Sequence, residues 1–181
     1  LNRAIVKQGL QIFKNRTNLG LKTLYDLCKI QSSPTTFDLG FKLGPRINAG
    51  GRVGKSSDGA DLLISEDPQK AYQIAISLDK YNTERQNIEM QLSEQIEIEA
   101  KKFHNHPVLV LAGSDWHEGV LGIIASKIKD KYNKPTIIIS LNKKIGKGSA
   151  RSIVGFDIGT QIIKAVQLNI LEKGGGHKMA G

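Results

Sequence analysis

A long helical pattern occupies the middle of the chain. Asp67 followed by Pro68 is a typical helix start, since aspartate caps free backbone N–H groups and proline fits the first helical position. His106-Pro107 ends the pattern, so we expect a helix to about Lys102, roughly 50 Å long at about 1.5 Å per residue. A helix of this length with a narrow apolar stripe is typical of a connection between domains. The stripe consists of Ala71, Ile74, Leu78, Tyr81, Ile88, Leu92 and Ile96.

Shorter elements are expected on both sides of this helix. Apolar spacing predicts amphipathic helices over residues 1–14 and 20–30, and a long Ser/Pro/Gly-rich connection without elements of its own over 31–58. Downstream, strands alternate with helices, which predicts a small α/β domain. The expected elements are strands Val108–Leu111, Thr136–Ser140 and Lys147–Ile153, and helices Gly119–Tyr132 and Ile158–Leu168, the second capped by Asp157.

Composition excludes several classes of protein. The 181 residues are 39% hydrophobic, which is ordinary for a globular protein and excludes a disordered tail. Val108–Ala112, one of the longest apolar runs, falls far short of the ~20 residues of a membrane span. The single cysteine, Cys28, excludes a disulfide scaffold, and its helical context predicts a core position.

The two ends of the sequence carry expectations of their own. No apolar leader with a cleavage site stands at the N-terminus, so we expect a protein of the reducing cytoplasm. The sequence starts at Leu1 rather than at Met and stops at Gly181, within a glycine-rich motif. We therefore expect a piece of a longer protein.

Charge is segregated along the chain. The net charge of +9 comes from two basic blocks, residues 1–56 with +8 and residues 103–181 with +6, which flank two acidic stretches, 57–65 with −2 and 66–102 with −3. This segregation is typical of a protein with a phosphate-rich partner, and solvated lysines on ordinary surfaces are the alternative. The placement of three of the six arginines indicates a phosphate-rich partner more strongly than the net charge does, because arginine suits bidentate phosphate contacts. They lie in Gly/Ser-rich stretches rather than on helix faces, and are Arg46, Arg52 and Arg151.

Two motif-like segments do not support the sites that they suggest. Gly50–Ser56 looks like the phosphate-binding loop of a nucleoside triphosphatase, but Ala49 stands where the pattern requires glycine, and no strand precedes it. His104-Asn105-His106 spells a nuclease-like tripeptide, but three adjacent loop residues do not converge on a metal by themselves. We expect neither segment to be a site.

Two stretches of the C-terminal part are candidate phosphate contacts. His117 lies between a strand end and a helix start, where anions bind, although Asp115 or Ser114 capping the helix is an equal alternative. The glycines of Gly146–Ser152 allow close approach of a ligand, and period two places two donors of this stretch on one face. The alternative for this stretch is an edge strand that contains glycine. The three candidate phosphate donors of the stretch are Ser149, Arg151 and Ser152.

The triplet Gly174, Gly175 and Gly176 is the strongest local signal. Three glycines cost backbone entropy, and we expect no packing role for them. Their successive N–H groups can form an anion-binding nest to which His177 and Lys178 add donors. A flexible linker is the alternative, although the serines typical of linkers are missing.

Four segments resemble the RecJ family of single-strand-specific DNA exonucleases, within the DHH phosphoesterase superfamily, and they occur in that family's order. The resemblance covers nearly the whole chain and departs from the family pattern at Gly50, where alanine is expected. The four segments are Gly44–Arg52 (GPRINAGGR), Trp116–Ser126 (WHEGVLGIIAS), Gly148–Ser152 (GSARS) and Gly174–His177 (GGGH).

The resemblance implies an α/β fold in three parts. Residues 1–65 would be the helical C-terminal part of a catalytic domain, 66–106 an interdomain helix, and 107–181 a small mixed-sheet DHH-associated domain, incomplete at its C-terminus. It further implies a 5′–3′ exonuclease of DNA repair and recombination that requires a divalent metal, Mn²⁺ or Mg²⁺. The family's metal-binding aspartates and DHH motif precede the region that matches Leu1. We therefore expect no metal ligands in this chain and no activity from it alone.

The resemblance also assigns roles to residues. Arg46 or Arg52, together with Ser149, Arg151 and Ser152, would hold a terminal 5′-phosphate. The loop of Gly174, Gly175 and Gly176 would approach the phosphates near the scissile bond, where His177 would stabilise developing charge, and His117 is a further contact. Single-stranded DNA is the implied partner, with a single-strand-binding protein and a helicase beside it, and no membrane.

Two other functions compete with this one. The first is a phosphodiesterase of the same superfamily that acts on oligoribonucleotides or cyclic dinucleotides, although those enzymes are compact and lack the long helix. The second is a module without catalysis that only binds single strands. Aromatic residues make up 6% of the chain, so less base stacking is expected than on an OB-fold platform.

Overall fold

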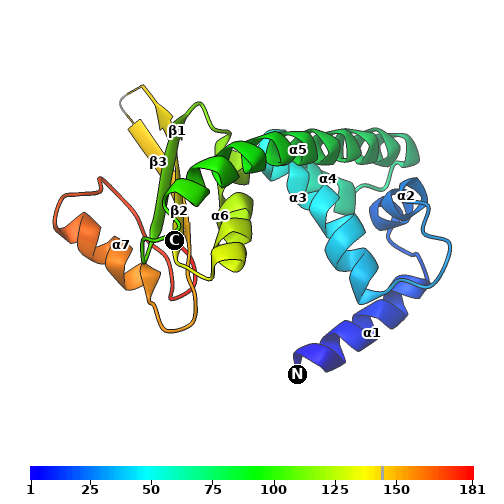
Figure 1. Cartoon of the computed structure of the whole chain (residues 1–181). Coiled ribbons are helices and arrows are strands. Elements are labelled where there is room, and N and C mark those ends of the chain that lie inside the picture. Colours follow the sequence, from blue (N-terminus) through cyan, green and yellow to red (C-terminus); the bar gives the residue numbers. More distant parts are fainter. Residues whose placement is uncertain (144) are drawn as a thin grey trace. The chain divides into compact units, whose positions relative to one another are not determined.

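The computed structural model describes residues 1–143 and 145–181, and the chain forms two compact units. The first unit is Leu1–Gln86 and the second is Asn87–Gly181. The boundary falls within the longest helix, α5 (Pro68–Lys102), which therefore contributes one half to each unit (Figure 1). No helix among the described residues is both long and apolar enough to cross a membrane.

The first unit is helical. Its core is formed by buried leucine, isoleucine and alanine side chains and by Tyr25, which is 1% exposed. The first half of α5 contributes Ala71, Ala75 and Leu78 to this core, as the apolar spacing predicted for Ala71 and Leu78. The other elements of this unit are α1 (Asn2–Lys14), α2 (Leu19–Leu27), a π-helix η1 (Asp38–Leu43), α3 (Gly44–Val53) and α4 (Asp58–Leu63).

The prediction of a long connection over residues 31–58 is wrong. The structure has η1 and α3 in this range, and α4 begins at its end. Pro45 does not interrupt α3, because it lies in the first turn of this helix. A backbone N–H at that position has no partner within the helix, so proline, which lacks one, is tolerated there. Gly50 is a packing residue, since a Cβ at this position would lie 2.5 Å from the carbonyl oxygen of Lys55.

The prediction for α5 is confirmed at both ends. The Asp67 carboxylate accepts the N–H of Gln69 at 2.9 Å, and Pro68 is the first residue of the helix. Lys101 and Lys102 occupy its last turn, where positive charge offsets the negative end of the helix dipole. The helix is more than a connection, because its second half supplies Leu92, Ile96 and Ala100 to the core of the second unit.

A three-stranded mixed sheet is the centre of the second unit. Its strands are β1 (Leu109–Ser114), β2 (Thr136–Asn142) and β3 (Ile145–Arg151), in the order β1-β2-β3. β1 is parallel to β2, and β3 is antiparallel to it. The helix α6 (Glu118–Tyr132) packs on one face through Val120, Leu121 and Ile124, which confirms the expected small α/β arrangement.

The C-terminal segment returns to this sheet after the last helix, α7 (Ile158–Gln167) (Figure 1). As predicted, Asp157 caps α7, and its carboxylate accepts the N–H of Thr160 at 3.0 Å. The final residues then lie beside β3, where the N–H of Ala150 donates to the carbonyl of Gly181 at 2.7 Å and the N–H of Gly181 donates to the carbonyl of Ala150 at 3.1 Å.

Cys28 lies half-buried against the core of the first unit, in agreement with its predicted structural role. Burial raises the pKa of its thiol above the ordinary value, although the nearby Arg46 guanidinium acts in the opposite direction. A raised thiol pKa disfavours the reactive thiolate.

Candidate nucleic-acid-binding site

One face of β3 carries three polar side chains, two of which were expected to contact phosphate. Alternation along the strand places Lys147, Ser149 and Arg151 on one face, as the sequence predicted for the last two. Register with β2 shows which face this is, because Ser149 pairs with the fully buried Ile138. The polar residues therefore continue the face on which α6 packs, at the edge of the sheet, where Ser149 and Arg151 are half-buried.

The guanidinium of Arg151 is held by its neighbours on β3. Its Nη1 donates to the Oγ of Ser149 at 3.1 Å and to the carbonyl of Ala150 at 2.7 Å. On the α6 side, a Cβ at Gly122 would lie 2.7 Å from Nη2 of Arg151 and 3.1 Å from Oγ of Ser149. A side chain at position 122 would displace these groups from where they lie, so α6 packs closely against the guanidinium that β3 holds.

Ser152 is placed differently from the other two predicted donors of this stretch. The residue is 1% exposed, and its hydroxyl donates to the carbonyl of Phe156 at 2.6 Å. Its N–H donates to the carbonyl of Met179 at 2.9 Å. These bonds hold the turn before α7 and the C-terminal segment, so the geometry gives Ser152 a structural role and leaves Ser149 and Arg151 as the accessible pair.

Ala180 connects the predicted glycine motif to Arg151. It forms an antiparallel bridge with Arg151 and a second one with His177. Residues paired in this way have Cα atoms about 4.5–5.5 Å apart, so the Cα atoms of Arg151 and His177 lie within about 11 Å of each other. The structure thus brings together two segments that lie far apart in the sequence, the GSARS stretch and the GGGH stretch.

His177 is exposed at a tight turn. Its N–H donates to the carbonyl of Ala180 at 2.8 Å, and the N–H of Ala180 donates back at 3.1 Å. Its ring Nδ1 accepts the N–H of Met179 at 3.2 Å. A neutral ring that accepts at Nδ1 carries its hydrogen on Nε2, so this second nitrogen is a donor that the turn itself does not use.

The expectation that the three glycines have no packing role is wrong for two of them. A Cβ at Gly176 would lie 2.3 Å from the carbonyl oxygen of Ala180, and one at Gly174 would lie 2.7 Å from Cγ2 of Ile162 on α7. At Gly175 nothing lies within 4 Å. Glycine at 174 and 176 therefore lets the segment pass close to α7 and to the C-terminal residues, and this close approach positions His177.

His117 caps α6, in place of the Asp115 or Ser114 named as alternatives from the sequence. Its Nδ1 accepts the N–H of Gly119 at 3.2 Å. Asp115 instead adopts a left-handed backbone, with φ of 58°. His117 is exposed, so capping does not prevent its Nε2 from meeting a ligand.

Acidic groups limit the positive charge of this region. Glu118, in the first turn of α6, accepts Nζ of Lys147 at 3.0 Å, so this lysine is already paired. The pKa of Asp157 is lowered, first by the N–H of Thr160 and in smaller part by the positive charge of Lys178. Among the charged groups of this site, Arg151 is the one that contacts both α6 and β3 most directly.

Arg46 and Arg52 lie on α3 in the first unit, so the expectation that they stand outside helices is wrong. Nε of Arg46 donates to the Asp79 carboxylate at 2.7 Å, and Nη1 donates to the carbonyl of Lys42 at 2.8 Å. These contacts tie α3 to α5 and η1. Arg52 is exposed. Participation of either arginine in one pocket with Ser149 and Arg151 stays a prediction.

Metal ligands do not gather anywhere in the part of the chain that the structure describes. Among residues 1–143 and 145–181, no group of three or more His, Cys, Asp and Glu side chains could hold a metal ion. The donor set at the site, with one guanidinium, one hydroxyl and imidazole N–H groups, is suited to anions rather than to cations.

Two residues of the site were not predicted from the sequence as functional. Gly122 supports the Arg151 guanidinium, and Gly159 on α7 lies against the turn at His177, since a Cβ there would be 2.8 Å from the carbonyl oxygen of His177. Both were placed in helices, where glycine is costly. That cost was the signal available in the sequence, because a helical glycine retained at such a position indicates close approach of another group.

Comparison with known proteins finds similar domains and sequences. Residues 105–181 match the DHHA1 domain, a range that includes β1–β3, α6, α7 and the C-terminal turn. The whole chain is similar to the single-stranded-DNA-specific exonuclease RecJ of Bacillus subtilis, with 36% identity over 99% of this chain and 23% of the relative. The RecJ of Haemophilus influenzae is 38% identical over 99% of this chain and 33% of its own length.

Solved structures give the same relationship. A crystal structure of RecJ with Mn²⁺ from Thermus thermophilus aligns with a TM-score of 0.86 at 27% identity, over 99% of this chain and 26% of that one. A structure of exonuclease RecJ bound to manganese aligns with a TM-score of 0.82 at 28% identity, over 99% and 44%. The chain spans about a quarter to a third of the length of the curated relatives it matches. Residues 105–181 therefore match the DHHA1 domain, and the chain is similar to RecJ in sequence and fold over nearly its whole length.

Proposed function

We propose that this chain is the substrate-binding part of a RecJ-type, 5′–3′ exonuclease specific for single-stranded DNA. Residues 1–65 would complete its catalytic domain, 66–106 would connect the domains, and 107–181 would hold the phosphates of the substrate. Support comes from the similarity to RecJ exonucleases over 99% of the chain. The same similarity is the basis for proposing a cytoplasmic location, a role in DNA repair and recombination, and a single-strand-binding protein and a helicase as partners.

The observation that carries the proposal is the joint placement of Arg151, Ser149 and His177. Arg151 is fixed by Ser149 and Gly122, and Ala180 pairs with both Arg151 and His177. A guanidinium, a hydroxyl and an imidazole N–H can all donate to phosphate oxygens, and contacts to phosphate do not depend on base identity. This set suits an exonuclease that must hold the end of any strand, and we assign it the terminal 5′-phosphate.

The metal of the reaction would be bound by other parts of the longer protein. Related RecJ structures contain Mn²⁺ or Mg²⁺, which supply the Lewis acid and the activated water in phosphodiester hydrolysis. The described residues of this chain offer no cluster for such an ion. Incubation of the chain alone with Mn²⁺ and a labelled strand is expected to release no mononucleotide, and release would contradict this assignment.

Fluorescence anisotropy tests the assignment of the phosphate site. The probes are a 5′-phosphorylated single strand, the same strand with a 5′-hydroxyl, and a duplex. We expect tightest binding of the phosphorylated strand. Arg151→Ala is expected to weaken that binding by about 1–3 kcal/mol, or about 5- to 150-fold, the range for a hydrogen bond to a charged group.

A matched control separates local from general charge effects. Lys164→Ala removes an exposed charge from α7 in the same unit and is expected to leave the preference for the 5′-phosphate unchanged. Equal binding of all three probes, with affinity lost as salt rises, would reduce the site to a basic surface. In that case Arg151, Ser149 and His177 would not form an end-binding pocket.

A further inference from the structure

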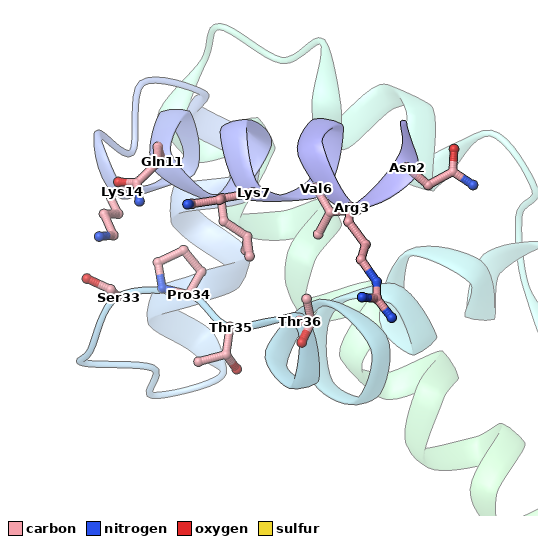
Figure 2. A pocket seen from close by; sticks show the side chains of 11 residues that line it. Asn2, Arg3, Val6, Lys7, Gln11, Lys14, Ser33, Pro34, Thr35 and Thr36 are labelled. Carbon is pink, nitrogen blue, oxygen red and sulfur yellow. The ribbon is translucent and has the colours of Figure 1, made fainter.

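A groove in the first unit carries positive charge that the proposed phosphate site does not use. It lies between α1 and residues 33–36 and has a volume of about 650 Å³. Figure 2 shows Arg3 and Lys7 extending from α1 toward the segment that contains Pro34 and Thr36, with Lys14 near Ser33. The apolar part of the groove is formed by Val6, Leu10 and Pro34.

The three cations form one stripe along α1. At about 100° per residue, Arg3, Lys7 and Lys14 point in directions within about 40° of one another. They span about 16 Å of the helix, long enough to meet more than one phosphate of a strand. None of the described residues that line the groove is acidic, and Asn2, Gln11, Ser33 and Thr36 add polar groups between the charges.

The carboxylate of Asp38, which contacts the groove residue Thr35, is paired with a lysine. Asp38 is 5% exposed, and its two oxygens accept Nζ of Lys42 at 2.8 Å and the hydroxyl of Thr35 at 2.7 Å. These hydrogen bonds, with that from Lys42 the largest contribution, hold the pKa of Asp38 at about 2. Its charge is therefore directed into these bonds and does not oppose an anion in the groove.

A stacked aromatic pair follows the groove in the chain. Phe37 comes directly after Thr36, and its ring lies 4.8 Å from the ring of Phe41 at an interplanar angle of 25°. Phe37 is 59% exposed and Phe41 is 71% exposed. Exposing two large aromatic rings to water is unfavourable, and a stacked, exposed pair beside a basic groove is how many proteins hold single-stranded nucleic acid.

We propose that this groove and the Phe37–Phe41 pair form a second contact for single-stranded nucleic acid. The groove takes the phosphodiester backbone through Arg3, Lys7 and Lys14, and the aromatic pair stacks on a base. The inference rests on the proposed function and adds to it a site distinct from the terminal-phosphate site at Arg151. A protein segment seated on Val6, Leu10 and Pro34 is the other occupant that such a groove could take, and the test separates the two.

The test uses the full chain and two 5′-hydroxyl probes, an oligothymidylate and an abasic strand of the same length. Replacing Arg3, Lys7 and Lys14 by glutamine keeps side-chain length and helix propensity while removing charge. We expect weaker binding of both probes, and a salt dependence of log K shallower by about 2, from about 0.7 for each lost phosphate contact. The control replaces three exposed lysines outside the groove, Lys22, Lys70 and Lys80, by glutamine.

The aromatic pair is tested with the same two probes. Replacing Phe37 and Phe41 by leucine is expected to weaken oligothymidylate binding by about 5- to 150-fold, the range for losing one base–aromatic stack, and to leave abasic binding unchanged. Phe41→Tyr retains a ring and is expected to bind as the wild type does. Circular dichroism checks that every variant keeps its helix content.

The outcomes separate a failure of this inference from a failure of the proposed function. If the glutamine variant binds both probes as tightly as its lysine control, the groove is not a phosphate contact and a protein occupant is favoured. If the leucine variant loses equal affinity for both probes, stacking on a base is excluded. If the preference for a 5′-phosphorylated strand still depends on Arg151 in either case, only this inference fails and the proposed function is kept. Absence of any strand binding by the wild type would remove the proposed function as well.

Discussion

Gly122 on α6 lies directly against the guanidinium of Arg151 on β3. A Cβ at position 122 would be 2.7 Å from Nη2 of Arg151, closer than carbon and nitrogen normally approach. The neighbouring Oγ of Ser149 would be 3.1 Å away. Because a long arginine side chain moves more easily than a helix backbone, a methyl group here would displace the guanidinium. The helix thus fixes the direction of a charge on the strand.

Gly122→Ala is expected to weaken binding of a 5′-phosphorylated single strand by about fivefold or more, about 1 kcal/mol, because it moves Arg151 without removing it. Alanine also favours helix by about 1 kcal/mol over glycine, so the thermal midpoint should not fall in step with affinity. Anisotropy and thermal unfolding measured together show this separation. Gly51→Ala on α3, with nothing within 4 Å of its Cβ, is the control and should leave affinity unchanged.

Gly176→Ala is expected to loosen the C-terminal turn. The new Cβ would lie 2.3 Å from the carbonyl oxygen of Ala180, a backbone atom that cannot move without breaking the pairing with His177. Amide hydrogen exchange of Ala180 and Gly181 should accelerate, by about tenfold for each 1.4 kcal/mol lost in the stability of the turn. Gly175→Ala meets nothing within 4 Å, and equal acceleration in that variant would show that the contact at 176 is unimportant.

Ile96→Ala and Ile98→Ala compare a buried and an exposed position on the same helix. Ile96 is fully buried in the core of the second unit, whereas Ile98 is 59% exposed. We expect the first substitution to lower the free energy of unfolding by about 2–5 kcal/mol and the second to change it by less than about 0.5 kcal/mol. Urea unfolding gives both values. Similar values for both would mean that the second half of α5 does not pack as described.

Asp38→Asn is expected to remove a pH-dependent part of the stability. The pKa of Asp38 is lowered from 3.8 to about 2, chiefly by the hydrogen bond from Lys42 and then by those from Thr35. A pKa that is lower in the folded than in the unfolded protein favours folding above pH about 4, and the contribution disappears as pH falls toward about 2. Wild type should therefore be more stable than the variant at neutral pH and lose that advantage over this interval.

Urea titrations at several pH values measure this difference directly. Thr35→Val removes one hydroxyl that donates to Asp38 and should show a smaller dependence over the same interval. A stability difference between wild type and Asp38→Asn that stays constant from neutral pH to pH about 2 would exclude the linkage.

The sequence predicted the elements whose local signals agree with one another. Asp67-Pro68 and His106-Pro107 defined α5 because capping chemistry and proline geometry act over a few residues. The same holds for Asp157 at the start of α7 and for the alternation that places Ser149 and Arg151 on one face. These are effects of near neighbours in the chain, which a single sequence contains.

Several of the errors concern glycine. Gly174 and Gly176 were expected to have no packing role, and the glycine-containing range 31–58 was expected to have no elements of its own, whereas positions 50, 174 and 176 each meet a neighbouring group too closely for a Cβ. Flexibility and close packing both require glycine, and a sequence does not state which applies. The contacts that decide between them join residues such as Gly122 and Arg151, which are distant in the chain and are brought together only by the fold.

The pairing of Ala150 with Gly181 has a consequence for self-association. An edge strand with free N–H and C=O groups can recruit the edge of another molecule and begin aggregation. At Ala150 both of these groups are already bonded: its N–H donates to the carbonyl of Gly181, and its carbonyl accepts the N–H of Gly181. Gly181 thus shields the C-terminal end of β3 from intermolecular pairing, so the segment that positions His177 also protects this part of the sheet edge.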